Sequence, residues 1–193
     1  MTKIEFKSLY SRNKLADFLD TNSTNQVKKL LKTFSCAKNA DVQDFLHNKA
    51  ITFERNLRSC TYLYTSNADK SVAGYFSIGI TYTLTNKLDK AVVKFLDGYT
   101  DESIAIPCYL VGQLGKSDSC VHKIGNYLLD DALSIIDKAQ DSLKGRFVLI
   151  DAVNEPKVLE FYKENSFIAV ENSTSNKSVK MVKPYFEYSE FKI

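Results

Sequence analysis

The sequence lacks long hydrophobic runs. No apolar stretch approaches the roughly 20 residues that a helix needs to cross a bilayer, and Met1–Phe6 holds no apolar segment ahead of a small-residue cleavage site. A membrane protein and a secreted protein are both disfavoured, so we expect a cytoplasmic location. Internal repeats and low-complexity segments are also absent. A chain of 193 residues with this character predicts a single domain over 1–193 with a sizeable core.

Metal-ligating side chains are few and scattered. The chain has 4 cysteines and 2 histidines, no Cys-x-x-Cys pair occurs, and His47 and His122 lie far apart. This is poor material for a metal site, and the histidines have no nucleophile beside them for Ser-His-Asp or Cys-His catalysis. Cys60 and Cys108 fall inside predicted strands, where we expect them to act as small buried hydrophobic residues.

Excess positive charge is small as well. Lysine and arginine number 26 against 23 acidic residues, which leaves a net charge of +3. Proteins that bind nucleic acid usually show a clustered basic face. The densest basic groups here are Lys28, Lys29 and Lys32, which fall on a helical pattern that favours a solvated face, and Lys177, Lys180 and Lys183. A phosphate-bearing cofactor or a modest RNA contact stays open.

Alternating helical and strand patterns fill the chain. Helices are predicted at 13–19, 26–34, 41–55, 88–96 and 121–139, and strands at 60–65, 72–82, 104–111, 147–152, 167–171 and 178–183. The first two strands form an antiparallel hairpin, whereas strand–helix–strand order makes 104–111 parallel to 147–152. We expect 178–183 to close the sheet antiparallel to 167–171. The predicted fold is α/β: a mixed, mostly antiparallel sheet with one parallel βαβ unit, flanked by helices.

Several residues mark the ends of helices. Ser117, Asp118 and Ser119 are N-cap candidates for the helix at 121–139, and Gly145 follows that helix as a stop residue. Asn154 precedes Glu155-Pro156 and is expected to cap the next helix, because proline suits a first turn.

The segment after the strand at 147–152 carries the most specific pattern. A strand ending in Asn154 leads into a short helix with Phe161-Tyr162, and then to Phe167. This order resembles the last third of the GCN5-related N-acetyltransferases (GNAT family), in which an Asn and a Tyr flank the thioester of acetyl-CoA. The resemblance is strongest over 41–185, with 1–40 as the N-terminal strand and helices of the same domain. Ser166 stands where the family usually has glycine.

The resemblance implies an acyltransferase that moves the acetyl group of acetyl-CoA directly to an amine, without a metal. Tyr162 would be catalytic, as the general acid that protonates the CoA thiolate. The implied cosubstrate contacts run from the end of the strand at 104–111 into the next helix and include two later residues: Gln113, Leu114, Gly115, Lys116, His122, Lys123, Ile124, Gly125, Asn126, Asn154 and Phe161.

The loop ahead of the helix at 121–139 departs from the family pattern. A helix N-terminus favours anions, and the family places the CoA pyrophosphate at this point. Of the family's usual glycines, only Gly125 is present. Lys116, His122 and Lys123 are therefore expected to supply part of the phosphate contact through their side chains.

Other roles remain open at this level. Tyr162 is alternatively a core tyrosine, and no spacing singles out a general base among Asp151, Glu54 and Tyr75. The acceptor is a small molecule, a protein amine or aminoacyl-tRNA; the last follows because 44–46, 60–63 and 74–77 resemble the toxin acetyltransferases that modify aminoacyl-tRNA. The rival function is a non-catalytic acyl-CoA-binding or interaction module on the same fold, and a homodimer stays open.

Overall fold

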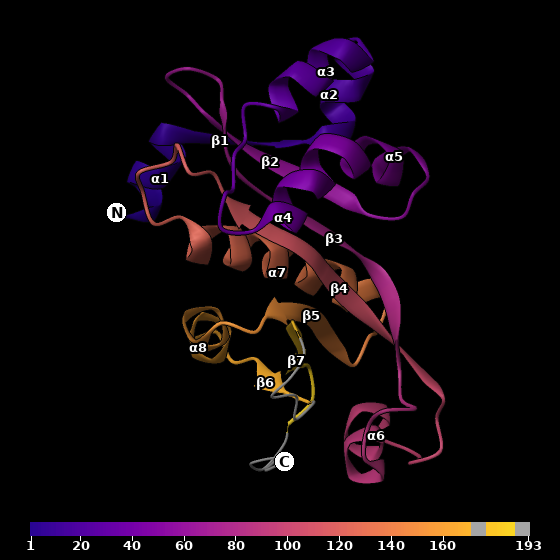
Figure 1. Ribbon diagram of the computed structural model, residues 1–193. Coiled ribbons are helices and arrows are strands. Elements are labelled where there is room, and N and C mark those ends of the chain that lie inside the picture. Colours follow the sequence, from indigo (N-terminus) through magenta and orange to yellow (C-terminus); the bar gives the residue numbers. More distant parts are fainter. Residues whose placement is uncertain (171–176, 188–193) are drawn as a thin grey trace. The chain divides into compact units, whose positions relative to one another are not determined.

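The computed structural model describes residues 1–170 and 177–187 (Figure 1). The helices are α1 (Lys3–Leu9), α2 (Leu15–Thr21), α3 (Thr24–Leu31), α4 (Ala40–Asp44), the π-helical turn η1 (Phe45–Lys49), α5 (Ala50–Arg55), α6 (Lys90–Asp97), α7 (Gly125–Ser142) and α8 (Pro156–Glu164). The strands are β1 (Tyr10–Lys14), β2 (Cys60–Ser66), β3 (Val72–Leu84), β4 (Ala105–Lys116), β5 (Phe147–Val153), β6 (Ile168–Ala169) and β7 (Ser178–Pro184).

The residues gather into two compact units. The first unit contains Met1–Gly79 with Gly112–Lys138, and the second contains Ile80–Val111 with the chain from Ala139 onward. Strands β3 and β4 and helix α7 each continue from one unit into the other. Among the described residues, no helix has both the length and the apolar character that a membrane span requires.

The strands form one sheet in the order β1-β2-β3-β4-β5-β7-β6. Pairing is antiparallel for β1 with β2, β2 with β3, β5 with β7 and β6 with β7, and parallel for β4 with β5. The predicted mixed, mostly antiparallel sheet with one parallel βαβ unit is confirmed. Strand β7 pairs with β6 as expected, although residue 171 of the predicted strand lies outside the described residues.

The parallel ladder is much shorter than its neighbour. Strand β4 pairs with β5 only at Tyr109↔Val148 and Leu110↔Leu149 among the described residues, whereas β5 pairs with β7 along its whole length. Val111, the last β4 residue of the second unit, therefore has no partner in this ladder. A strand whose ladder stops early leaves backbone hydrogen-bonding groups for other partners.

Apolar packing in the first unit joins helices α2–α5 to the antiparallel strands, and Figure 1 shows α2, α3 and α5 grouped on one side of β1–β3. Leu15, Leu31 and Leu46 are fully buried there. Tyr75 of β3 is also fully buried, and its hydroxyl donates to the carbonyl oxygen of Val42 at 2.5 Å. This bond ties β3 to α4 and satisfies a hydroxyl that burial would otherwise leave costly.

The second unit has its own core beneath α6. Val92, Val93 and Leu96 of α6 belong to one buried cluster with Phe147 and other residues of β4, β5 and β7. The end of α6 is held by the side chain of the residue just before β5. Arg146 donates through Nε to the carbonyl oxygen of Leu96 at 2.7 Å, which satisfies one of the carbonyls that a helix end leaves unpaired.

The N-terminal elements differ from the prediction. The helix predicted at 13–19 starts later, as α2, because Tyr10–Lys14 forms β1, and helix α1 was missed. Strand β1 is mostly polar and only Tyr10 is buried, so its sequence shows no alternation of apolar and polar residues. The strand is defined by its pairing with β2. A signal for α1 was present, because Thr2 and Glu5 form a capping box.

Three expectations about helix ends and cysteines were wrong. Helix α7 begins only at Gly125, after the residues proposed as its cap. Asn154 is not the N-cap of α8, because Glu155 holds that position without a side-chain cap bond, although Pro156 occupies the first turn as expected. Cys60 is exposed, contrary to the prediction, whereas Cys108 is buried and its burial raises the pKa of the thiol to about 12.

Gly145 serves packing rather than helix termination. Helix α7 ends at Ser142, and Gly145 does not have a positive φ. A Cβ at this position would lie 2.5 Å from the ring of Tyr109. The small residue is therefore explained by the close approach of an aromatic ring.

Candidate functional site

The loop between β4 and α7 is fastened to its surroundings in the first unit. The amide of Ser117 donates to the carbonyl oxygen of Ala73 at 2.8 Å, and the amide of Asp118 donates to that of Ser35 at 2.8 Å. The Asp118 carboxylate accepts from the amide of Ala37 at 2.8 Å. Ser117 and Asp118, which were expected to cap α7, thus anchor the loop to β3 and to the segment after α3.

Lys116 turns toward the loop that follows it. Its ammonium contacts the carbonyl oxygen of Cys120 and lies 3.3 Å from that of Ser117. The charge therefore organises loop carbonyls. His122 is half-buried and Lys123 is exposed, so their side chains are available on the outer side of the loop.

A run of backbone donors leads into α7. The amides of Val121, His122, Lys123 and Ile124 have no acceptor within the described part of the chain. They lead directly into α7, which begins at Gly125. The Ile124 side chain is fully buried and packs at Gly74, so this residue faces a ligand only through its backbone. Consecutive free amides at a helix N-terminus favour an anion.

A hollow of about 630 Å³ lies beside these donors. It is lined by Met1, Val121, His122, Lys123, Asn126, Tyr127 and Asp130. Three of these residues were expected to contact the cosubstrate: His122, Lys123 and Asn126. The hollow is of the size that small-molecule sites usually have.

The end of β4 supplies the remaining predicted positions of the first unit. Gln113 and Leu114 are half-buried, and Gly115 is buried. A Cβ on Gly115 would lie 2.4 Å from Val42 Cγ1 and 3.1 Å from Phe34. The glycine therefore makes room for the helical layer.

Asn154, Phe161 and Tyr162 belong to the second unit. Tyr162 is buried, and its ring packs against Phe161 at 5.0 Å and Phe167 at 5.6 Å between ring centroids. Its hydroxyl has no hydrogen-bond partner in the described residues, and burial raises the pKa of this phenol to about 12. The hydroxyl therefore keeps its proton at neutral pH, as a proton donor must.

Asn154 and Tyr162 stand at opposite ends of α8. The amide of Asn154 donates to the carbonyl oxygen of Lys177 at 3.0 Å, which fixes the chain just before the helix. Tyr162 is the seventh residue of α8, about 9 Å along the axis from Pro156. Phe161, next to Tyr162, is half-buried.

Ser166 explains why a glycine is usual at its position. Its φ is 67°, in the left-handed region that side chains other than glycine rarely occupy. Here the chain leaves α8, and the amide of Phe167 returns to the carbonyl oxygen of Tyr162 at 3.0 Å. The backbone that presents Tyr162 is thus kept despite the substitution.

The candidates for a general base differ in availability. Tyr75 is fully buried and commits its hydroxyl to Val42, so it cannot orient a water molecule. Glu54 is partly buried, which raises its pKa, and it accepts from the amide of Thr61 at 2.7 Å. Asp151 is exposed on β5, opposite Lys180 in the register with β7.

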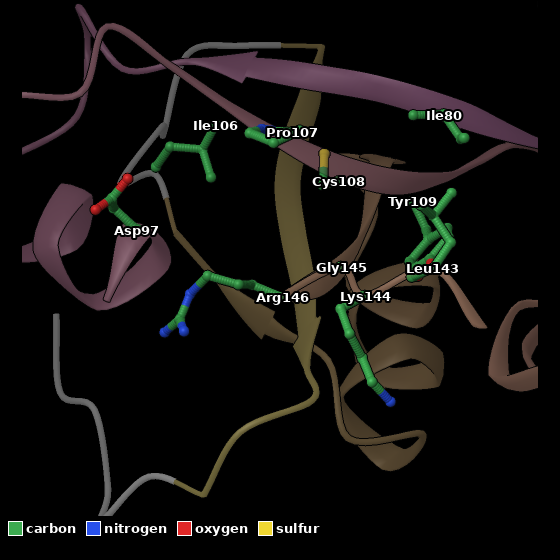
Figure 2. A pocket seen from close by; sticks show the side chains of 10 residues that line it. All are labelled: Ile80, Asp97, Ile106, Pro107, Cys108, Tyr109, Leu143, Lys144, Gly145 and Arg146. Carbon is green, nitrogen blue, oxygen red and sulfur yellow. The ribbon is translucent and has the colours of Figure 1, made fainter. Parts of the chain in front are cut away.

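A separate pocket of about 450 Å³ lies in the second unit (Figure 2). Its walls are mostly apolar and include Ile80, Ile106 and Cys108. Figure 2 shows the Arg146 and Lys144 side chains pointing in different directions, and Arg146 is bonded to the end of α6. None of the residues expected at the site lines this pocket, so it is separate from the predicted contacts.

Sequence reasoning missed the residues behind His122. The hydroxyl oxygen of Tyr10 lies 2.6 Å from His122 Nδ1 and 3.3 Å from Cys120 Sγ. Tyr10 belongs to β1, a strand that has no hydrophobic alternation, so no sequence signal linked it to a loop more than 100 residues away.

No known family profile matches the sequence, and no curated protein does. Similarity appears among solved structures. One is AtaT complexed with acetyl-methionyl-tRNAfMet, with 21% identity and a TM-score of 0.66 over 91% of this chain and 94% of that chain. Another is a tyrosine-to-phenylalanine mutant of KacT, with 16% identity and a TM-score of 0.70 over 91% of this chain and 95% of that chain.

A third solved structure includes both a small molecule and a partner. It is a tyrosine-to-phenylalanine mutant of the AtaT toxin bound to the C-terminus of the antitoxin AtaR and to acetyl-CoA. Identity is 19%, with a TM-score of 0.59 over 79% of this chain and 85% of that chain. This chain has the GNAT fold. The resemblance to the GNAT family that the segment with Asn154, Tyr162 and Phe167 indicated is confirmed for the fold.

Proposed function

We propose that this chain transfers the acetyl group of acetyl-CoA to the α-amino group of an aminoacyl-tRNA. The carrying observation is the run of free amides at 121–124, which leads into a helix N-terminus on the GNAT fold. Two relatives in fold support the substrates: AtaT complexed with acetyl-methionyl-tRNAfMet, and the AtaT mutant bound to acetyl-CoA. The antitoxin in the latter structure supports a protein partner for this chain too.

The phosphates of acetyl-CoA are assigned to the loop at the start of α7. The amides of 121–124 would receive the pyrophosphate, with Gly125 and Asn126 beside it at the start of α7 and His122 and Lys123 adding side-chain donors. Gln113, Leu114 and Gly115 would meet the pantetheine arm through their backbone, as an added strand does. Asn154 and Phe161 would complete the cosubstrate contacts.

The chemistry requires one nucleophile and one acid. The neutral amine attacks the thioester carbonyl carbon and forms a tetrahedral intermediate. The carbon–sulfur bond then breaks, and the Tyr162 hydroxyl donates its proton to the departing thiolate. The nitrogen releases a proton to solvent, and the Tyr162 phenolate takes up a proton from solvent, which restores the phenol. Correct placement of amine and thioester supplies much of the rate.

An α-amino group is a suitable acceptor for a site in which no residue is identified as a general base. Free α-amino groups have pKa values of about 7.7–8.0, whereas lysine side chains lie near 10.4, so a far larger fraction of an α-amine is already neutral at pH 7. Lys28, Lys29 and Lys32 are exposed on and just after α3, and such side chains suit the phosphates of an RNA. These features favour aminoacyl-tRNA over a lysine acceptor.

The proposal is tested in two steps. Acetyl-CoA should raise the melting temperature, because a ligand that binds only the folded state stabilises it. Charged tRNA, uncharged tRNA, free amino acids and a lysine peptide are then compared as acceptors. Acetylation of charged tRNA alone supports the proposal. Binding without any transfer would instead favour a non-catalytic acyl-CoA-binding module, and the absence of binding would refute both readings.

A further inference from the structure

We propose that Tyr10 is a positioning residue for His122. It holds the imidazole so that Nε2–H is presented to the hollow beside α7, where it donates to a phosphate of acetyl-CoA. This inference rests on the proposed function, which places those phosphates at the loop. It adds a residue of β1 to a site otherwise assigned to the strand–loop–helix at 113–126.

The short distance between Tyr10 and His122 favours one direction for the hydrogen bond. The two atoms, Tyr10 Oη and His122 Nδ1, lie 2.6 Å apart. Bonds donated by N–H groups usually measure about 2.9–3.0 Å, and hydroxyl groups generally form shorter bonds. We therefore assign the phenol as the donor and Nδ1 as the acceptor. A neutral imidazole carries one proton, so acceptance at Nδ1 places that proton on Nε2.

Cys120 holds the same hydroxyl from a second side. Its sulfur lies 3.3 Å from Tyr10 Oη and 3.7 Å from the carbonyl oxygen of His122, and its side chain is buried. Burial, followed by the contact with Cys120, raises the pKa of Tyr10, so the phenol remains a neutral donor. The thiol and the imidazole together leave the hydroxyl little freedom to rotate.

The ring of Tyr10 is fixed as firmly as its hydroxyl. It is buried, lies 5.3 Å from the ring of Phe6, and its backbone pairs with Ser66 of β2. The imidazole of His122 meets it edge-on, with a centroid distance of 5.9 Å and an angle of 78°. A rigid strand residue thus sets the orientation of a loop side chain before any ligand binds. The imidazole therefore loses less conformational entropy on binding than a freely rotating ring would lose.

His122 is placed to use that orientation. It is half-buried, it lines the hollow of about 630 Å³, and Lys123 lines the same hollow. Its Nδ1 points to Tyr10, and Nε2 has no partner in the part of the chain that the structure describes. An N–H at Nε2 would join the free amides of the loop as a side-chain donor. Hydrogen bonds to charged groups are among the stronger ones.

The orientation is tested first without any ligand, by nitrogen-15 NMR of the two imidazoles in alkaline buffer. The sequence has only 2 histidines. His47 is an internal reference, because its Nε2 lies 3.0 Å from the carbonyl oxygen of Phe34 and must donate to it. We expect both rings to carry the proton on Nε2, and Tyr10→Phe to give a tautomer mixture for His122 alone. A proton on Nδ1 of His122 in the parent protein would overturn the inference.

The role in binding is tested by a double-mutant cycle on acetyl-CoA affinity. His122→Ala should weaken binding by about 10-fold, the loss expected for one hydrogen bond to a charged group. Tyr10→Phe should weaken it by several-fold, and the double variant should bind no worse than His122→Ala. Tyr64→Phe is the matched control, because it deletes another buried hydroxyl of the same unit, bonded to Asp131 at 2.5 Å. It should bind as the parent does.

The outcomes separate the two claims. A Tyr10→Phe effect that persists undiminished in the His122→Ala background, or that equals the control, shows a structural role and overturns the inference. If the parent protein binds no acetyl-CoA, the proposed function fails, and the phosphate contact of His122 fails with it. If the parent binds and only the cycle is additive, the proposed function stands and the inference fails.

Discussion

Tyr162→Phe removes one oxygen atom and separates catalysis from packing. The ring contacts to Phe161 and Phe167, at 5.0 and 5.6 Å between centroids, involve no hydroxyl and should survive. The phenol also has no hydrogen-bond partner in the described residues, so no buried acceptor loses its donor there. We expect the free energy of unfolding to change by less than about 1 kcal/mol.

The expected kinetic effect is much larger than the structural one. Burial raises the pKa of Tyr162 to about 12, so the phenol of the parent protein is fully protonated at neutral pH, and the mutation removes this proton donor. General acids usually contribute about 10²–10⁴-fold, which corresponds to roughly 2.7–5.4 kcal/mol in the barrier. A fall in kcat of that size cannot come from partial unfolding when stability is nearly unchanged. Affinity for acetyl-CoA should stay within a few-fold of the parent.

The assay is a single-turnover reaction. Protein saturated with acetyl-CoA is mixed with the acceptor, quenched, and free CoA is measured by chromatography; thiol reagents are avoided because Cys60 is exposed. Tyr109→Phe is the matched control, since it removes another phenol of the same unit, one that donates to the carbonyl oxygen of Leu143. A Tyr162→Phe rate within threefold of the parent, or no slower than the control, would refute the acid role and leave Tyr162 as a core residue.

Three further predictions follow from the same geometry. Ser166→Gly should raise the free energy of unfolding by about 0.5–1 kcal/mol, because it relieves a φ of 67° at some entropic cost; a loss of stability in urea titrations would contradict this. Lys123→Ala should weaken acetyl-CoA binding without changing kcat, and added salt should weaken the parent's binding more than the variant's; equal salt slopes would show that Lys123 is only solvated surface. Stability should fall as the pH rises from about 8.5 to 12 and above, because burial raises the pKa of Cys108, Tyr162 and Tyr75, so the unfolded chain releases these protons first; undiminished stability at pH 12 would refute it.

Most of the fold could be predicted from strong local signals. Helix α7 has an apolar stripe at helical spacing, whereas β2, β3 and β5 are short runs of apolar, β-branched and aromatic residues that are buried almost continuously. Strand β1 could not be predicted in this way, because four of its five residues are not buried and the strand is defined only by its pairing with β2. Tertiary pairing of this kind leaves no local trace in the sequence.

The candidate site could be predicted from the sequence only in part, because some of its groups belong to the backbone or come together only through the fold. Tyr162 and Asn154 could be proposed from the sequence because a residue type and a spacing mark them, and their roles stay predictions. The amides of 121–124 belong to the backbone, which every residue shares, so no residue type reveals them. Tyr10 reaches His122 only through the fold, and a contact across more than 100 residues has no spacing to recognise.

The most direct test of the account is the fate of a labelled acetyl group. The protein is incubated with carbon-14 acetyl-CoA and a pool of charged tRNA, the RNA is precipitated, and mild alkali releases the amino acids for mass spectrometry. The account predicts label on the RNA fraction that alkali frees as N-acetyl amino acid, and almost none with Tyr162→Phe or with uncharged tRNA. Acetyl-CoA that binds but leaves the charged tRNA unlabelled would contradict it.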